Sequence, residues 1–510
     1  MNSLAYPCAS VPEVPEGHYS RLCPCPSGDW PAHDEDKLHK LADLMRDSDA
    51  KRDARERTSA MASGYVYLGQ FIDHDLTRDK LLLCDATPDV AATPNYRTAR
   101  LDLDLLYGKN PSAVPCIYEG EGRLKLGLTQ ARKGRKSTED DLPRQRDGTA
   151  ILVDPRNDEN LIVAQMHVLF AKFHNRTLDL LKANPSLSAG PVGASSFEQA
   201  RRFVTWHYQW IIVNDFLPGF VKRHVLNNVF KNRTLRLFPR VNTPDDSRLA
   251  LPVEFTAAAF RFGHSMVQEV YLLNTQYLVP TKKIIEMTKN GGGIGPTAPS
   301  LPADFVIDWD FFFRENDTSL NRGENIDTFI AEALYELSAP IVELFRARNS
   351  LNKTTLAEFM LPVPELTLRR GSKIRLPAGE EFARTFGFVP IAPEDIGTTL
   401  EDKAFFSQEA FRGRTPLWYY LLREASFEDV HELEPGNPHG VPIQKLGTIG
   451  SQIVAEVFLQ ILAAESTSIL NAGRDWSPPK FGFGSSTSDR ALDSMPNLVD
   501  FIQSTEHGAR

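Results

Sequence analysis

The feature that most constrains the fold of this chain is a set of long segments whose apolar residues recur at helical spacing. In residues 161–181, Val163, Met166, Leu169 and Phe173 are placed for a largely buried helix. Alternating strand patterns are scarce. The sequence therefore predicts an all-α fold, with one large, mainly helical domain, long ordered loops and little β-structure. Further helical stretches are expected at 34–57, 65–76, 197–230, 254–270, 327–344 and 443–465.

The 510 residues are 42% hydrophobic, which is ample for a buried core. Proline-rich residues 1–32 are expected to form an irregular N-terminal arm, and residues 33–510 a single domain. Net charge is −9 with both signs interspersed, so no basic surface for nucleic acid stands out. No stretch approaches the roughly 20 apolar residues of a membrane span.

The start of the chain lacks the basic residues and apolar core of a signal peptide. The odd number of cysteines, five, agrees with a reducing compartment. We expect a cytoplasmic location, or export by a route without a recognisable signal peptide.

A polar face lies on an otherwise apolar helix. Gln70, Asp73, His74 and Thr77 stand at positions i, i+3, i+4 and i+7 of one helix. Such polar groups must be paired, solvated or functional, and a hydrogen-bonded core histidine is the simplest alternative. Asp73, His74 and Asp75 point in different directions, so they cannot bind one metal ion together. The spacing favours Asp73 and His74 facing one cavity, and Asp75 another.

A second polar cluster follows at residues 98–104. A curved loop there would direct Thr98, Asp102 and Asp104, with one main-chain carbonyl, toward a hard cation such as calcium. A half-buried strand with a polar face fits the same pattern. Calcium would need a further carboxylate, for which Asp75 is a candidate.

These segments resemble the animal haem peroxidase superfamily, the myeloperoxidase and cyclooxygenase group. Residues 69–76 resemble its distal-helix motif and residues 101–108 its calcium loop. Residues 154–160 and 173–176 resemble the distal-arginine segment and the helix after it, and residues 259–264 the proximal-histidine motif. The few cysteines and the absent signal peptide fit a bacterial-type member better than the secreted animal enzymes.

The resemblance implies that His264 is the proximal ligand of haem iron, whose other ring nitrogen needs an acceptor. The family usually supplies an asparagine three residues before an arginine. Here Thr367 stands three residues before Arg370, which departs from that pattern. Arg261 would contact a haem propionate, with Arg370 as a weaker candidate.

On the distal side, the resemblance implies that His74 is the acid–base group that cleaves the O–O bond of hydrogen peroxide. Arg156 would stabilise negative charge on the departing oxygen, and Gln70 would order a distal water or halide. Asp73 and Glu159 occupy the positions that form ester bonds to haem methyls in the peroxidase branch. The alternatives are a buried hydrogen bond for Asp73 and a helix N-terminal carboxylate for Glu159.

Position 160 follows the second ester position, and myeloperoxidase has there a methionine that forms a sulfonium link to haem. Asn160 cannot form that link. Oxidation of bromide, iodide, thiocyanate or phenols is therefore expected more than oxidation of chloride.

The calcium ligands implied by the family are Asp75, Thr98, Asp102, Asp104 and the main-chain carbonyl of Arg100. The ion would fix the distal helix to a loop beside the distal histidine.

The implied function is a haem peroxidase that uses hydrogen peroxide to oxidise halides, pseudohalides or small aromatic donors, with a role in oxidative stress. A fatty-acid oxygenase of the same superfamily is the first alternative. In cyclooxygenases the substrate hydrogen is abstracted by a tyrosine three residues before the proximal histidine, where Arg261 stands here; Tyr65 and Tyr208 remain open for that role. A non-catalytic haem- or calcium-binding scaffold is the second alternative, but haem binding alone requires neither His74 nor Arg156.

Overall fold

The structure of the chain is a computed structural model. It describes residues 15–24, 34–47, 58–81, 83, 89–146, 148–187, 193–244, 249–292, 300–314, 321–335, 361–433, 442–472, 476–483 and 488–504.

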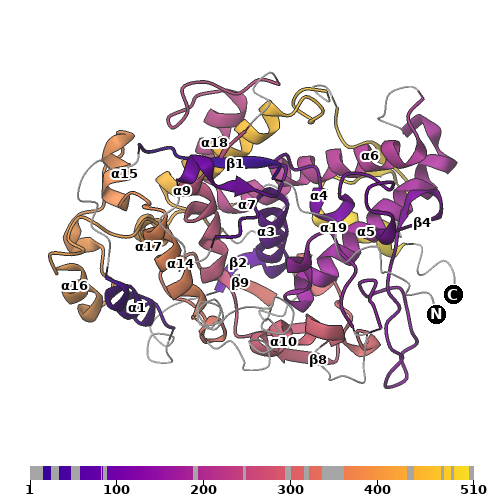
Figure 1. The fold of residues 1–510 in the computed structure, drawn as a ribbon, viewed down its shortest axis with the longest axis horizontal. Coiled ribbons are helices and arrows are strands. Elements are labelled where there is room, and N and C mark those ends of the chain that lie inside the picture. Colours follow the sequence, from indigo (N-terminus) through magenta and orange to yellow (C-terminus); the bar gives the residue numbers. More distant parts are fainter. Residues whose placement is uncertain are drawn as a thin grey trace.

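Helices α3 (Ser63–Leu76) and α5 (Leu161–Ala183) pack against each other in the middle of the molecule (Figure 1). Phe71 of α3 stacks on Phe170 of α5, with ring centroids 5.0 Å apart. Asn160 begins α5 by accepting a hydrogen bond from the backbone N–H of Val163, which satisfies one of the free donors at the helix start. These two helices confirm the helical expectations for residues 65–76 and 161–181.

Helix α6 (Ser196–Ile211) begins with a capping box and continues through a π-helical turn, η6 (Ile212–Phe216), into α7 (Leu217–Phe220). Helix α8 (Arg223–Leu226) and a second π-helical turn follow. The helical expectation for residues 197–230 is therefore confirmed except at Val221 and Lys222, where the backbone is extended and separates α7 from α8.

A second group of helices comes from the C-terminal third of the chain (Figure 1). In chain order they are α14 (Val363–Lys373), α15 (Gly379–Thr385), α16 (Leu400–Phe406), α17 (Leu417–Glu428) and α18 (Thr448–Ala464).

Several short helices complete the described α-structure. They are α1 (Glu35–Leu44), α4 (Asp104–Tyr107), α9 (Val253–Thr256), α10 (Thr281–Gly292), α11 (Asp310–Phe313) and α19 (Met495–Gln503). Two 3₁₀ segments matter for the site, η4 (Pro155–Asp158) and η8 (Ala259–Met266).

The described strands are short and form small sheets. One sheet has three strands, in which β1 (Gly17–Ser20) pairs antiparallel with β3 (Pro94–Asn95) and parallel with β6 (Leu251–Pro252). The other sheets are antiparallel pairs: β2 (Thr58–Ala62) with β9 (Arg322–Glu324), β4 (Tyr118–Glu119) with β5 (Arg123–Leu124), β7 (Val270–Asn274) with β8 (Tyr277–Pro280), β10 (His431–Glu432) with β11 (Ile443–Gln444), and β12 (Lys480–Phe481) with β13 (Arg490–Ala491). The prediction of a mainly helical chain with little β-structure is confirmed.

Three local expectations differ from the structure. The arm expected to be irregular contains β1, which pairs with two strands from distant parts of the chain. Residues 254–270 form α9 and η8 in place of one helix. Residues 327–331 are not helical and a 3₁₀ turn follows at Glu332–Leu334, whereas the rest of the helix expected at 327–344 lies mostly outside the described residues.

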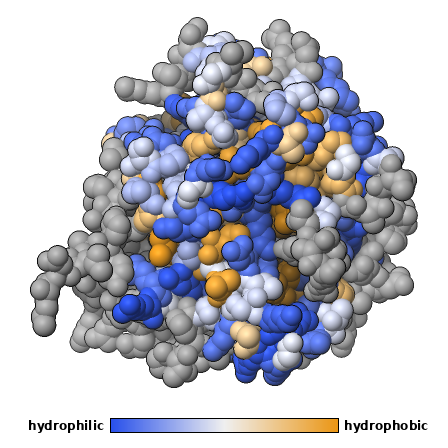
Figure 2. Space-filling view, turned by 90° about the vertical axis from the view of Figure 1, so that its right-hand side faces the viewer, coloured by the Kyte–Doolittle hydropathy of each residue, from blue (hydrophilic) through white to orange (hydrophobic). Residues whose placement is uncertain are grey.

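Most of the buried apolar residues belong to one continuous core that includes α3, α5, α6 and α18. Cys23 is buried and free, while Cys116 is disulfide-bonded, so not every cysteine is a free thiol. Among the described helices, none combines the length and apolar character needed to cross a bilayer. From the side that lies at the right of Figure 1, the coloured surface is mostly hydrophilic, with apolar residues in separate groups (Figure 2).

Candidate active site and metal centre

His74 lies near the C-terminal end of α3 and is buried. Its Nδ1 lies 2.8 Å from Oδ1 of Asn157, so Nδ1 carries the proton and donates it to the amide oxygen. Burial and the nearby Arg156 guanidinium lower the pKa of His74 to about 3. The imidazole is therefore neutral at pH 7, with Nε2 as its basic nitrogen.

The Arg156 guanidinium is held at the same end of α3. Its Nη2 donates to the carbonyl oxygens of His74 and Thr77, at 3.0 and 2.6 Å, and its Nε donates to Asp154 at 3.1 Å. Among the described residues, none accepts a hydrogen bond from Nη1. Arg156 thus binds the carbonyl groups at the end of α3 through Nη2. Its Nη1 can donate a hydrogen bond to a ligand.

Asp154 is fully buried and binds three arginines. Arg78 donates to Oδ1 at 3.1 Å, Arg97 donates to Oδ2 at 3.0 Å, and Arg156 contacts both oxygens. Although burial raises the pKa of Asp154, the facing Arg156 and Arg97 outweigh burial and hold it well below its usual range. Nη1 of Arg97 also lies 3.7 Å from Asp104, which links this ion cluster to the acidic loop.

Two further residues expected on this face lie half-buried on α3. Oε1 of Gln70 accepts a hydrogen bond from the Asn160 amide at 3.2 Å. Oδ1 of Asp73 accepts one from the Thr77 hydroxyl at 3.2 Å. Burial raises the pKa of Asp73, although Arg261 and Arg156 act in the opposite direction. Glu159 ends η4 and faces Arg156, whose pKa it helps to raise.

His264 lies in η8, which packs against α3. Its ring meets the Trp418 ring edge-on, with centroids 5.9 Å apart. Nδ1 is buried and has no hydrogen-bond partner among the described residues. Burial and Arg261 lower the pKa of His264 to about 3, so this imidazole is also neutral. Thr367 is not its partner, because the Thr367 hydroxyl donates to the carbonyl of Val363 at 2.8 Å.

Basic side chains gather beside η8. Arg261 lies three residues before His264, and its Nε donates to the carbonyl of Thr256 at 3.0 Å. Arg261, Arg370 and Lys373 line one cavity. Burial lowers the pKa of Arg261, and Arg370 adds to that effect. The cavity is therefore suited to an anionic group.

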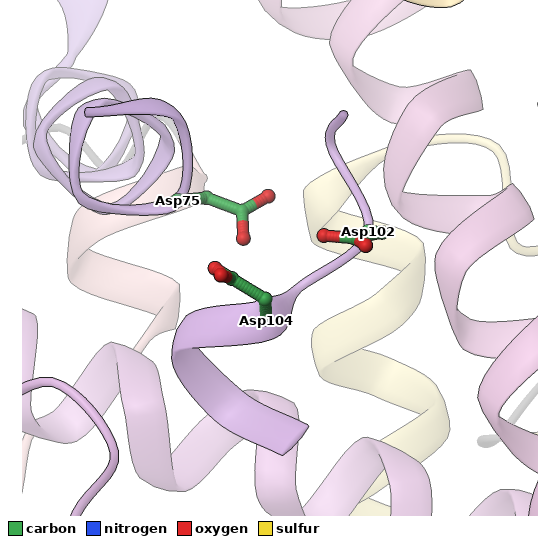
Figure 3. A group of neighbouring side chains, drawn as sticks. All are labelled: Asp75, Asp102 and Asp104. Atoms are coloured by element: carbon green, nitrogen blue, oxygen red, sulfur yellow. The ribbon is translucent and has the colours of Figure 1, made fainter. Parts of the chain in front are cut away.

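Three carboxylates converge beside the C-terminal end of α3 (Figure 3). Asp75 comes from α3, Asp102 from the loop and Asp104 from the start of α4, and their oxygens lie within 4.8 Å of one another. One oxygen each of Asp75 and Asp104 is buried and has no hydrogen-bond partner among the described residues. Burial and the neighbouring carboxylates raise the pKa of Asp75 well above its usual value. Burial likewise raises the pKa of Asp104 to about 7.

The loop that carries these groups has an unusual backbone. Ala99, Leu101 and Leu103 have φ values of 54°, 55° and 58°, a region that side chains other than glycine rarely adopt. The Thr98 hydroxyl lies 2.8 Å from Asp102, while the Arg100 side chain turns away toward Glu465. Three strained residues in alternation are consistent with a loop whose shape serves a bound ion.

Residues 75–291 match the animal haem peroxidase family. The chain is 32% identical to myeloperoxidase from Mus musculus over 263 residues, which are 49% of this chain and 31% of the relative. Over these residues the chain is similar to the animal haem peroxidase family. It spans less than a third of the length of the curated relatives it matches.

Two solved structures share the fold of this chain. Peroxidase A from Dictyostelium discoideum has a TM-score of 0.58 at 15% identity, over 90% of this chain and 91% of that chain. A fatty acid alpha-dioxygenase from Oryza sativa has a TM-score of 0.54 at 12% identity, over 97% of this chain and 80% of that chain. At these identities the likeness concerns the fold alone.

Haem is the cofactor that the superfamily implies, and the donor set fits it. A half-buried, neutral imidazole at His264 suits haem iron, and its buried Nδ1 has no hydrogen-bond partner among the described residues. The basic cavity of Arg261, Arg370 and Lys373 suits the carboxylates of a haem edge. The unpartnered oxygens of the acidic cluster fit a calcium ion in the same way.

Sequence reasoning assigned no role to Asn157, Asp154 or Trp418. Asn157 and Asp154 lie in the segment that resembles the distal-arginine block. Their closeness to Arg156 in the sequence was the signal that could have identified them. No local pattern pairs Trp418 with His264, because the two residues are far apart in the chain.

Proposed function

We propose that this chain is a haem peroxidase that uses hydrogen peroxide to oxidise small electron donors. The observation that carries the proposal is the pairing of a neutral His74 with Arg156 at one end of α3. Binding haem requires neither residue, whereas cleaving a peroxide bond requires both a base and a fixed positive charge.

When bound, haem supplies an iron centre that takes up the oxidising equivalents of peroxide. Nε2 of His74 accepts a proton from hydrogen peroxide and returns it to the departing oxygen, so that oxygen leaves as water. Asn157 keeps Nδ1 protonated throughout and so keeps Nε2 available. The Arg156 guanidinium lowers the energy of negative charge on the departing oxygen.

We assign haem binding to His264 as the iron ligand and to Arg261 and Arg370 as the partners of the propionates. Asp73 and Glu159 are proposed as the two ester-forming carboxylates. Support for Asp73 comes from its half-buried position on the same helix as His74, where the charges of Arg261 and Arg156 both favour its carboxylate form. Haem retained after acid–organic extraction of Asp73→Val combined with Glu159→Gln would end the ester proposal.

We propose calcium at the cluster of Asp75, Asp102 and Asp104, with Thr98 and the Arg100 carbonyl completing the ligands. The ion would offset the repulsion among carboxylates that burial makes costly. Its role is to hold the end of α3, and with it His74, against the loop.

For the donor, we propose bromide, iodide, thiocyanate or a phenol in preference to chloride. The amide pair of Gln70 and Asn160 would face such a donor with neutral polar groups. The oxygenase alternative has less support, because Arg261 stands where a cyclooxygenase-type tyrosine would. The Tyr65 hydroxyl donates to Asp215 at 2.9 Å, and burial raises its pKa well above the usual value.

The proposal is tested by mixing the haem-loaded protein with hydrogen peroxide and following the visible spectrum in a stopped-flow instrument. His74→Ala should slow the peroxide-dependent change by a factor on the order of 10² or more. His224→Gln, a change at an exposed histidine, serves as the control and should leave the rate unchanged. Equal rates in His74→Ala and the unmutated protein would remove His74 from the reaction and sink the proposal.

A further inference from the structure

A cavity of about 320 Å³ lies between α14, α15 and the start of α17. Its apolar lining includes Leu368, Leu376, Leu417 and Trp418, all of them buried. It shares no lining residue with the basic cavity beside η8. It is therefore a separate cavity, which lies on the side of His264, and the proposed function assigns no role to it.

The rim of this cavity is charged. Arg384 and Arg414 line it with exposed guanidiniums, and the exposed Glu381 carboxylate adds a single opposite charge. An apolar interior below two guanidiniums favours a ligand with one flat apolar ring and one anionic end. A guanidinium matches a carboxylate in geometry as well as in charge.

Trp418 connects this cavity to the proximal histidine. Its ring lines the cavity and also meets the His264 ring edge-on, with centroids 5.9 Å apart. Its Nε1 donates to the carbonyl of Arg261 at 3.2 Å, which fixes the orientation of the indole. A ring that packs on the cavity face of Trp418 is thus separated from His264 by a single side chain.

We propose that this cavity binds a small phenol bearing a carboxylate, and that the phenol is oxidised there through Trp418. The inference rests on the proposed function, because peroxide supplies the oxidant. Each phenol loses one electron, which passes through Trp418 and His264, and its hydroxyl proton is released to solvent. Two phenols return the two electrons that one hydrogen peroxide removes, so the products are two phenoxyl radicals and two waters.

Binding is tested directly by isothermal titration of the haem-loaded protein with 3-(4-hydroxyphenyl)propionate. Tyramine, which has the same phenol but a cationic end, is the matched probe and should bind at least about tenfold more weakly. Arg384→Glu combined with Arg414→Glu should weaken binding of the propionate by about tenfold or more. Arg412→Glu changes an exposed arginine outside the cavity lining and should leave binding unchanged.

The electron path is tested with Trp418→Phe, which keeps an aromatic ring in the cavity. Binding of the propionate should stay within about twofold, while its peroxide-dependent oxidation slows by at least about tenfold relative to that of iodide. Equal binding of both probes, or binding unaffected by the double arginine change, would overturn the cavity assignment. Unchanged propionate oxidation in Trp418→Phe would overturn the path through Trp418.

Failure of the proposed function would look different from failure of this inference. A wild-type protein that oxidises neither iodide nor the phenol lacks peroxidase activity, and calorimetry still decides whether the cavity binds the probe. A protein that oxidises iodide but does not bind the propionate is a peroxidase without this site.

Discussion

At the residue scale, Asn157 determines which nitrogen of His74 carries the proton. Its Oδ1 accepts from His74 at 2.8 Å, and its Nδ2 lies 3.0 Å from Nδ1 of His167 on α5. Both histidines are buried, and burial lowers the pKa of His167 to about 4. The three side chains form a neutral chain in which Nδ1–H of His74 donates to Oδ1 of Asn157, and Nδ2–H of Asn157 donates to Nδ1 of His167.

Replacing Asn157 by Leu should therefore slow the reaction with peroxide without removing haem. The imidazole of His74 would lose the acceptor that fixes its tautomer, and we expect a rate lower by about 100-fold. Stopped-flow spectra at several peroxide concentrations measure the rate of the reaction with peroxide. Asn214→Leu, at an exposed asparagine bonded only to its own helix, is the control. A rate for Asn157→Leu equal to that control would contradict this positioning role.

Asp154→Asn should destabilise the protein strongly. The change replaces the carboxylate that Arg78, Arg97 and Arg156 share by a neutral amide in a buried site, and breaking such a buried ion cluster costs about 3–5 kcal/mol. The free energy of unfolding in urea tests this value. Asp179→Asn, which affects an exposed pair with Arg123, should cost less than about 1 kcal/mol. Similar losses for both variants would show that the buried cluster contributes no more than a surface pair.

At the element scale, two glutamates of helix α17, the buried Glu424 and the half-buried Glu428, cap the start of α18. Glu424 accepts hydrogen bonds from the backbone N–H groups of Ile449 and Gly450 at 3.0 and 3.1 Å. Glu428 accepts from the backbone of Thr448 and pairs with Lys222. The first turn of α18 thus obtains acceptors from a neighbouring helix in place of a local cap.

This arrangement makes stability depend on pH. Burial and Glu428 raise the pKa of Glu424 from 4.5 to about 8. Between those values the unfolded chain has lost a proton that the folded chain keeps, so stability falls as pH rises. We expect Glu424→Gln to reduce this fall by up to about 1.4 kcal/mol per pH unit. Urea unfolding at pH 5, 6, 7 and 8 measures the slope. The exposed Glu401→Gln should not change it, and an unchanged slope in Glu424→Gln would contradict the assignment.

Calcium should stabilise the junction of α3 and the loop of residues 98–104. The proposed ion would bind the folded acidic cluster and not the unfolded chain, so at about 100 times its dissociation constant it should add roughly 2.7 kcal/mol. Thermal unfolding with added calcium, and after chelation, measures the effect. Asp75→Asn should abolish the difference, whereas Asp179→Asn should retain it. A calcium effect that persists in Asp75→Asn would place the ion elsewhere.

At the scale of the whole molecule, the sequence predicted elements better than their contacts. Apolar spacing located α3 and α5 because helical periodicity is local. The sequence also allowed the convergence of Asp75 with the loop of residues 98–104 to be predicted, since a bound cation requires several carboxylates. The meeting of Trp418 with His264 was not, because it depends on how α17 packs against η8.

Irregular segments were the hardest to foresee for a related reason. Strand β1 forms only because β3 and β6, which are distant from it in the chain, pair with it. These two partner strands are too short to show the alternating apolar pattern of a strand in the sequence. The segment at 254–270 is divided where α9 ends at Thr256 and Ala258, with φ −137° and ψ −71°, leaves the helical region before η8 begins. In both places long-range packing, rather than local propensity, decides the backbone.

The measurement that tests the central claim most directly is the visible absorption spectrum of the purified protein supplied with haem. We predict a strong Soret band for the unmutated protein, and a band that is lost or clearly shifted in His264→Ala while far-ultraviolet circular dichroism stays the same. No Soret band in the unmutated protein, or an identical band in folded His264→Ala, would contradict haem ligation by His264.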